Sequence, residues 1–242
     1  MVLLGTIVNG VAIAVGTLLG LFFTRIPENT KTIVMQAMGL TVVVLGIDMG
    51  LQSEHILIVI ISLAIGGVWG EAWRLDDRLN QLGAWIEVKA GASEGSVAKA
   101  FVTATLVFVI GALSVVGALD SGLRHDHQIL YTKSLIDGFI AMIFATTLGF
   151  GVIFSAIPVI LYQGTIALLA TQVQILFSPE QLEVLITELT ATGGILIFAI
   201  GLNLLKIMSI KVVNLLPSLF ITGILVYALQ YKEMLLSYLP WL

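Results

Sequence analysis

Long apolar runs follow one another with few interruptions along this chain of 242 residues. A helix of about 20 apolar residues can cross the roughly 30 Å hydrocarbon layer of a bilayer, because every backbone N–H and C=O is paired within its own segment. Only 11% of the residues are charged, whereas a soluble domain has roughly 25%. The sequence therefore predicts an all-α integral membrane protein, organised as one polytopic domain over residues 1–242.

The polar breaks between the apolar runs predict about eight transmembrane helices. The fifth and sixth come from one apolar run, 135–177, which we divide at Ser155–Pro158 because proline disfavours helical geometry at the residue before it. A cleavable signal peptide needs positive charge at its start, and the first basic residue is Arg25, so the first run is expected to remain as a span. The expected spans are 2–23, 32–52, 55–73, 98–119, 135–154, 158–177, 182–205 and 211–230.

The lysines and arginines predict the orientation of these spans, because short cytoplasmic loops carry the excess of positive charge. Eight of the eleven lie beside connections that follow odd-numbered spans, and three lie on the other side. Both termini are therefore expected outside, and the longest connection, 74–97, in the cytoplasm. The eight are Arg25, Lys31, Arg74, Arg78, Lys89, Lys99, Lys206 and Lys211, and the three are Arg124, Lys133 and Lys232.

The first three spans resemble the last three, which predicts an internal repeat. Repeat A covers about residues 2–73, repeat B about 158–230, and central helices at about 98–154 lie between them. An odd number of spans separates each matched pair, so the repeats would be inverted. Inverted repeats are common in transporters, whose halves exchange conformations, but they can also be purely structural. The alignment places Asn9 on Gln163, Gly39 on Gly194, Gly46 on Gly201 and Asp48 on Asn203.

Polar residues inside the predicted spans are the candidate pathway for an ion or solute, because an ionisable residue there costs roughly 2.5–3.5 kcal/mol to insert. Asp48 is the leading candidate, with no Lys or Arg within one helical turn, and Asn203 is its neutral counterpart in the repeat. The alternative is that Asp48 lies near the outer surface, in contact with water. For the matched pair Asn9 and Gln163, the favoured interpretation is hydrogen bonding that holds helices together.

Further candidates lie near the ends of spans. Lys133 and Asp137 are four residues apart and so share a helical face on which they can pair, and Asp120 ends the preceding span. These three form either an outer vestibule that selects solutes by charge or ordinary residues of the headgroup region. Gln36 belongs with the polar first half of the seventh span, which either lines a cavity or lies at the surface. That half contains Thr187, Glu188, Thr190 and Thr192.

Glycines interrupt the fourth and fifth spans, at positions 111, 117, 149 and 151. Transporters use discontinuous helices near the midplane to expose backbone groups to solute, whereas close packing of neighbouring helices also selects glycine. Small residues on helix faces favour association as well, so a homodimer is the expected oligomer.

The connection 74–97 carries an amphipathic pattern, with Leu75, Leu79, Leu82 and Ile86 on one helical face, Trp85 beside it and charges opposite. Such a helix lies in the membrane interface, or it packs on the surface of a partner protein. The second interpretation supports an alternative function, a non-transporting scaffold or accessory protein that binds a partner through this segment.

Several motifs resemble one known family. They are GTIVNG (5–10), GALSVVGALDSGL (111–123), KSLIDGF (133–139) and TLGFGVIFSAIPVILYQG (147–164). Together they are similar to the domain of unknown function 554 (DUF554) family of uncharacterised bacterial membrane proteins, over essentially the whole chain. The resemblance implies a multi-spanning protein of the bacterial cytoplasmic (inner) membrane, in a family sometimes regarded as transporters. It implies no substrate and no catalytic residue.

The sequence also argues against several kinds of chemistry. The chain has no cysteine, which excludes disulfides, cysteine-ligated zinc and a cysteine nucleophile. His125 and His127 are expected in a solvated loop rather than at a metal. No nucleophile–base arrangement, phosphate-binding loop or cofactor motif appears, so neither an enzyme nor a cofactor is expected, and an enzyme acting on lipid is the third hypothesis. The net charge of −4 is spread thinly and predicts no nucleic-acid partner.

The leading hypothesis is a transporter or channel for an ion or small solute, working by alternating access between the inverted repeats. Its partners would be the lipid bilayer and the solute, and protonation of Asp48 would be a coupling step.

Overall fold

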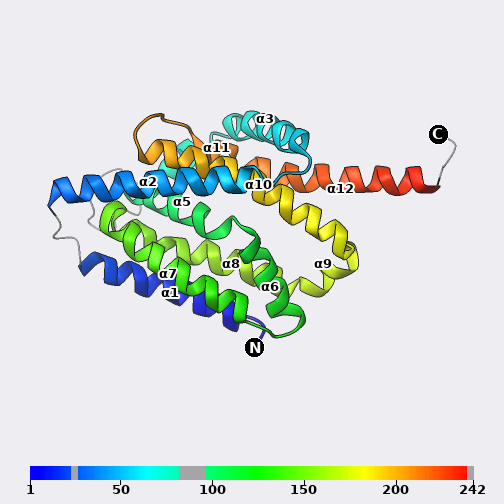
Figure 1. The fold of residues 1–242 in the computed structure, drawn as a ribbon, viewed down its shortest axis with the longest axis horizontal. Helices are drawn as coiled ribbons and strands as arrows, with labels where there is room; N and C mark the ends of the chain where they lie inside the picture. Colours follow the sequence, from blue (N-terminus) through cyan, green and yellow to red (C-terminus); the bar gives the residue numbers. More distant parts are fainter. Residues whose placement is uncertain (23–26, 82–95, 239–242) are drawn as a thin grey trace.

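The computed structural model describes residues 1–22, 27–81 and 96–238, and within these residues every regular element is a helix (Figure 1). Within the described part of the chain, six helical stretches are long and apolar enough to cross a membrane, and the number rises to eight if each of two bent helix pairs is one span. The prediction of an all-α membrane protein is confirmed for the described residues. The expected number of spans, about eight, is the upper end of this range.

Most of the helices run back and forth along the long axis of the molecule, which is horizontal in Figure 1. The first three spans and the seventh begin and end within four residues of their predicted bounds. The helices are α1 (Leu4–Phe22), α2 (Glu28–Gly50), α3 (Ile56–Ala72), α5 (Ser96–Val109), α6 (Ala112–Leu123), α7 (Gln128–Leu148), the 3₁₀ helix η1 (Phe150–Ser155), α8 (Ala156–Leu168), α9 (Ala170–Leu176), α10 (Pro179–Leu204), α11 (Val212–Leu215) and α12 (Pro217–Tyr238).

The sequence at the start of α10 explains why this helix begins where it does. The Ser178 hydroxyl accepts a hydrogen bond from the backbone N–H of Gln181 (3.3 Å), and the Gln181 side chain accepts one from the backbone N–H of Ser178 (2.8 Å). This capping box satisfies two donors that a helix start otherwise leaves unpaired. Pro179 follows at the first helical position, where its missing N–H costs nothing.

Two helix breaks occur at glycines, which is one of the two interpretations that the sequence left open for positions 111 and 149. Gly111 separates α5 from α6 with a φ of 135°, and the two helices are bent by 61°. Gly149 ends α7 with a φ of 83°. Only glycine adopts these conformations without strain. The predicted fourth span is therefore two helices rather than one, whereas Gly117 lies inside α6 and Gly151 inside η1.

The division between the fifth and sixth spans lies earlier than predicted. The sequence places it at Ser155–Pro158, but α7 ends at Leu148 and the next span begins at Phe150. Pro158 is the third residue of α8, and proline is tolerated in the first turn of a helix because the N–H groups there have no helical partner. The glycine, rather than the proline, makes the break.

Contacts between helices concentrate within two groups. We call α1, α5, α6, α7, η1, α8 and α9 the α1 bundle, and α2, α3, α10, α11 and α12 the α10 bundle. In Figure 1, α1, α7 and α8 lie below α2, α10 and α12. Fewer contacts join the two bundles, mainly those of α10 with α5 and α6 and of α2 with α7. The apolar core includes Phe108 and Phe144 from the first bundle and Leu196 and Ile197 from the second.

Glycines allow the closest helix pair of each bundle to pack backbone against backbone. In the α1 bundle, Gly16 of α1 lies against the backbone of Gly138, and Gly20 lies against that of Met142, so α1 and α7 run parallel. In the α10 bundle, Gly46 lies against Gly194 and Phe198, and Gly201 lies against Gly39 and Val43, so α2 and α10 run antiparallel. A side chain at any of these glycines would overlap the facing helix.

The predicted interfacial helix at 74–97 is described only in part. A short helix at Leu75–Gln81 follows α3 at an angle of 52°. Leu75 and Leu79 of the predicted apolar face belong to this helix, whereas Leu82, Trp85 and Ile86 lie outside the described residues.

Candidate functional site

Four polar side chains meet inside the α1 bundle. We call them the polar cluster: Asn9 of α1, Lys133 and Asp137 of α7, and Gln163 of α8. Asn9 and Gln163 are fully buried, and the exposed fractions of Lys133 and Asp137 are 5% and 3%. Sequence analysis singled out all four residues, but as two separate pairs. The structure joins the pairs at one place.

One carboxylate oxygen is the centre of the cluster. Oδ2 of Asp137 accepts hydrogen bonds from the Lys133 ammonium and from Nδ2 of Asn9, the latter at 3.0 Å. Nδ2 of Asn9 also donates to Oε1 of Gln163, at 3.3 Å. The Lys133–Asp137 ion pair follows from the spacing of four residues, which places both side chains on one face of α7.

The close packing of α1 on α7 explains how Asn9 reaches this carboxylate. Because Gly16 and Gly20 let the two backbones touch, α1 lies near enough for a short amide side chain to bridge to α7. Gly10, the next residue after Asn9, faces Ile160 of α8. Asn9 therefore lies where three helices of the bundle meet.

Two polar atoms of the cluster have no hydrogen-bond partner. They are Oδ1 of Asn9, an acceptor, and Nε2 of Gln163, a donor, and both are buried. The hydroxyl of Thr6, one turn before Asn9, is likewise buried and unpaired. Buried polar atoms are nearly always paired, and a lost partner costs about 1–3 kcal/mol. The arrangement can therefore offer one acceptor, one donor and a hydroxyl to a small polar molecule.

Asp48 and Asn203, the leading pair from the sequence, are not brought together. The antiparallel packing of α2 on α10 places Gly46 near Gly194 and Gly201 near Gly39, so Asp48 lies beside the middle of α10 and Asn203 beside the middle of α2. Asp48 is exposed. The Asn203 amide donates to the Ile210 carbonyl and accepts from the Ile210 N–H, both at 2.8 Å, which closes the turn after α10.

The remaining two predicted residues also lie apart from the cluster. Asp120 pairs with Arg124 at 3.2 Å near the end of α6. Gln36 is exposed on α2. Of the eight predicted pathway residues, the structure thus joins Asn9, Gln163, Asp137 and Lys133, and separates Asp48, Asn203, Asp120 and Gln36 from them.

Polar side chains along α10 form hydrogen bonds that join this helix to its neighbours. Glu188 is fully buried, and its carboxylate accepts hydrogen bonds from the Ser53 hydroxyl (2.7 Å) and from the backbone N–H groups of Glu54 and His55 (2.9 Å each). These donors precede α3, so Glu188 caps the start of that helix from outside it. Thr192 and Thr222 share a hydrogen bond at 2.9 Å between α10 and α12.

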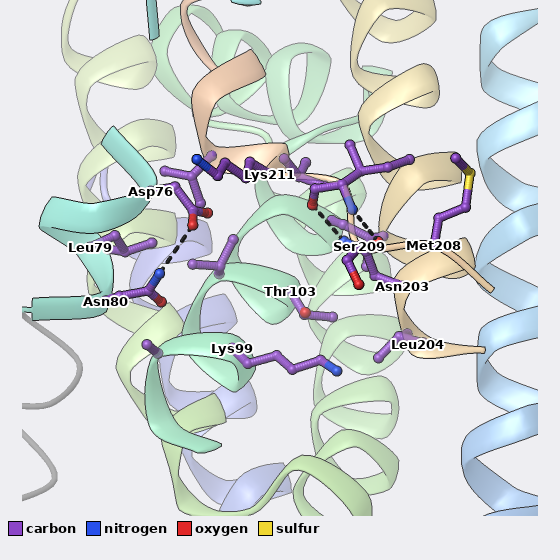
Figure 2. A pocket seen from close by; sticks show the side chains of 16 residues that line it. Asp76, Leu79, Asn80, Lys99, Thr103, Asn203, Leu204, Met208, Ser209 and Lys211 are labelled. Carbon is purple, nitrogen blue, oxygen red and sulfur yellow. Dashed lines mark hydrogen bonds between the residues drawn. The ribbon is translucent and has the colours of Figure 1, made fainter. Parts of the chain in front are cut away.

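A polar pocket of about 520 Å³ lies where the two bundles meet. It lies between the first turns of α5, the end of α10 and the following turn, α11, and the helix Leu75–Gln81. Figure 2 shows Lys99 running along one side of it, Asp76 bonded to Asn80, and Asn203 bonded to the turn at Ile210. Lys211, also in the wall, lies 3.5 Å from Glu71, and both side chains are more than half exposed.

No sequence pattern indicates this pocket, since its walls come from three separate segments whose meeting depends on the tertiary fold. Asn203 was the one candidate that belongs to it. Within the described residues, no three His, Asp or Glu side chains gather in a way that could hold a metal ion.

Comparison with known proteins gives matches over nearly the whole chain. The family model "Protein of unknown function (DUF554)" matches residues 4–227. The chain is 36% identical over 231 residues to the "Uncharacterized membrane protein YdfK" of Bacillus subtilis (strain 168), covering 93% of this chain and 96% of that protein. It is 28% identical over 224 residues to the "Uncharacterized protein YqgA" of Escherichia coli (strain K12), covering 90% and 94%. No solved structure matches.

Proposed function

The chain belongs to the DUF554 family of proteins of unknown function, and from this premise we propose that it carries an ion or small solute across the membrane by alternating access. The proposed location is the bacterial cytoplasmic membrane, with both termini outside. The proposed role is transport rather than catalysis, and the solute site is the polar cluster.

The observation that carries this proposal is the burial of a charged pair and two amides inside an apolar bundle. Ionisable residues within membrane spans are costly, face protein or water, and mark solute and proton pathways. Amides that served only to hold helices together would be expected to pair all their polar atoms. Asn9 and Gln163 each keep one buried atom unpaired. This favours a site that binds a solute over a set of hydrogen bonds that only holds helices together.

The division into two bundles supports alternating access. Few contacts join the α1 bundle to the α10 bundle, so the two bundles could move against each other. The breaks at Gly111 and Gly149 supply the discontinuous helices on which transporters commonly rely. The pocket between the bundles would be the cytoplasmic approach, since Lys99 and Lys211 lie in its wall and cytoplasmic ends carry the basic residues.

We further propose that spans 1–3 and 6–8 are inverted repeats. The alignment matches Gly39 with Gly194 and Gly46 with Gly201. If the two repeats are exchanged, the contact of Gly46 with Gly194 becomes the contact of Gly201 with Gly39. Both contacts exist. Asn9 and Gln163, matched in the same alignment, bond to each other. Reciprocal contacts of this kind are expected of two halves related by a two-fold axis.

Solute flux into liposomes that contain the purified protein tests the proposal. Removing only one charge of the Lys133–Asp137 pair would leave the other buried and unpaired, at a cost of about 3–5 kcal/mol. The variant to use is therefore Lys133→Met combined with Asp137→Asn, which removes both charges. Alkali cations, halides and small organic solutes are offered to vesicles with wild-type protein, with the variant, and with no protein.

The matched control is Arg124→Gln combined with Asp120→Asn. This pair has the same four-residue spacing, but the Arg124 side chain is 75% exposed. Flux that the control retains and the cluster variant loses is the expected result. Equal flux in both would remove the cluster from the pathway, and wild-type flux no greater than that of empty vesicles would contradict transport itself.

A further inference from the structure

The polar cluster combines one cation, one anion and two neutral amides, so its formal charge is zero. A solute with a net charge would leave an uncompensated charge among residues that are at most 5% exposed, and burial of an unpaired charge is costly. The cluster therefore suits a solute that is neutral overall.

The hydrogen-bonding groups of the cluster form two complementary halves. The Lys133 ammonium and Nε2 of Gln163 can only donate, whereas the Asp137 carboxylate and Oδ1 of Asn9 can only accept. Nε2 of Gln163 and Oδ1 of Asn9 are unpaired. The donor half fits a carboxylate, and the acceptor half fits a group with several N–H donors, such as a primary ammonium. Because the Asn9 and Gln163 side chains touch at 3.3 Å, both halves lie within reach of one small molecule.

From these two features, and resting on the proposed transport function, we infer that the solute is a small zwitterion with a carboxylate and a primary ammonium, of the size of an amino acid. Its carboxylate binds Lys133 and Gln163, and its ammonium binds Asp137 and Asn9. In the empty protein Lys133 and Asp137 bind each other instead. No buried charge is left unpaired in either state, which lets the empty site close and return across the membrane.

The first test uses wild-type protein and solutes that differ by one feature. Vesicles with the purified full chain are offered a radiolabelled pool of the common amino acids, then acetate, which has only the carboxylate, and methylammonium, which has only the ammonium. Glycine betaine serves as a matched competitor, because it keeps both charges but its trimethylated nitrogen has no N–H to donate. We expect protein-dependent uptake of amino acids, no uptake of the half-molecules, and no competition by betaine.

The second test changes the protein. Gln163→Met removes the free donor, together with the oxygen that accepts from Asn9, without changing any charge. Loss of the donor's hydrogen bond to a carboxylate should weaken amino-acid binding about tenfold or more. Lys133→Met with Asp137→Asn should abolish saturable uptake. Gln174→Met, at an exposed position of α9, is the matched control and should leave uptake unchanged. Size-exclusion profiles verify that each variant is folded.

The outcomes separate this inference from the function on which it rests. Protein-dependent flux of an ion, of acetate or of methylammonium that needs the cluster, without amino-acid uptake, would overturn the zwitterion and leave transport standing. Competition by betaine equal to that of amino acids would overturn the role of Asp137 and Asn9 as acceptors for an ammonium. Absence of protein-dependent flux for every solute would overturn both.

Discussion

The buried polar residues Glu188, Asn9 and Gln163 are of two kinds, distinguished by whether their hydrogen bonds are complete. Glu188 accepts three hydrogen bonds and fastens α10 to the start of α3. Asn9 and Gln163 are equally buried but each keeps an unpaired atom. A structural role is sufficient to explain Glu188. Unpaired buried atoms such as those of Asn9 and Gln163 are expected where a solute binds and supplies the missing partners.

Glu188 should therefore matter for stability. Glu188→Ala leaves the Ser53 hydroxyl and the N–H groups of Glu54 and His55 without their acceptor, and we expect a loss of about 2–5 kcal/mol in the free energy of unfolding. Glu188→Gln keeps one acceptor oxygen and should cost less. Thermal unfolding of purified protein in detergent measures the effect. Glu183→Ala, exposed on the same helix, is the control, and an equal loss in both variants would refute the capping role.

Single residues were predictable where the signal is local. The four-residue spacing predicted the Lys133–Asp137 pair. The contacts of Asn9 with Asp137 and Gln163, however, join residues 128 and 154 positions apart, and no local pattern encodes them. The sequence ranks Asp48 first because this carboxylate stands in an apolar run with no Lys or Arg within one helical turn. Such a run does not reveal which face of its helix points outward, and Asp48 is exposed on α2.

At the scale of helices, the close pairs depend on glycines that face backbone. A methyl group at Gly46 would overlap the backbone of Phe198, and one at Gly201 would overlap Val43. We expect Gly46→Ala and Gly201→Ala each to lower the free energy of unfolding by about 1–3 kcal/mol, because overpacking forces the helices apart. Similar losses in the two variants would fit the reciprocal packing of α2 and α10.

The matched control for these variants is Gly223→Ala in α12, where the nearest atom to the new methyl group is 4.0 Å away. Alanine favours helix over glycine by about 1 kcal/mol, so this variant should be neutral or slightly more stable. Unfolding in denaturant compares all three. If Gly46→Ala were as stable as Gly223→Ala, the tight packing of α2 on α10 would be contradicted.

Helix positions were largely predictable, because apolar runs and polar breaks fix where a chain can cross a bilayer. The error at Ser155–Pro158 arose from treating proline as the stronger breaker. Proline interrupts a helix only beyond its first turn, whereas Gly149 adopts a φ of 83° that ends α7. The bend at Gly111 was expected only as an interruption, since its angle depends on how α6 packs against α7 and α8.

At the scale of the whole molecule, the order of crossings predicts the sides on which the loops lie. His125 and Ser209 are exposed, and α7, the η1–α8 span and α10 lie between them. Three crossings would place them on opposite sides, and the proposed orientation puts His125 outside and Ser209 in the cytoplasm. Since the chain has no cysteine, His125→Cys and Ser209→Cys can be labelled singly in intact cells with a membrane-impermeant reagent. Labelling of both from one side would contradict this topology.

The central claim, that the polar cluster opens to both sides of the membrane in turn, is tested most directly by a single cysteine at Thr6. This residue is fully buried beside the cluster, and its hydroxyl has no partner. Ser62→Cys is the control, since Ser62 is equally buried and unpaired but lies in α3 of the other bundle. An impermeant thiol reagent is applied to right-side-out and to inside-out vesicles. Alternating access predicts that Thr6→Cys reacts from both sides and Ser62→Cys from neither. Failure of Thr6→Cys to react from one of the two sides, or from both, would contradict alternating access.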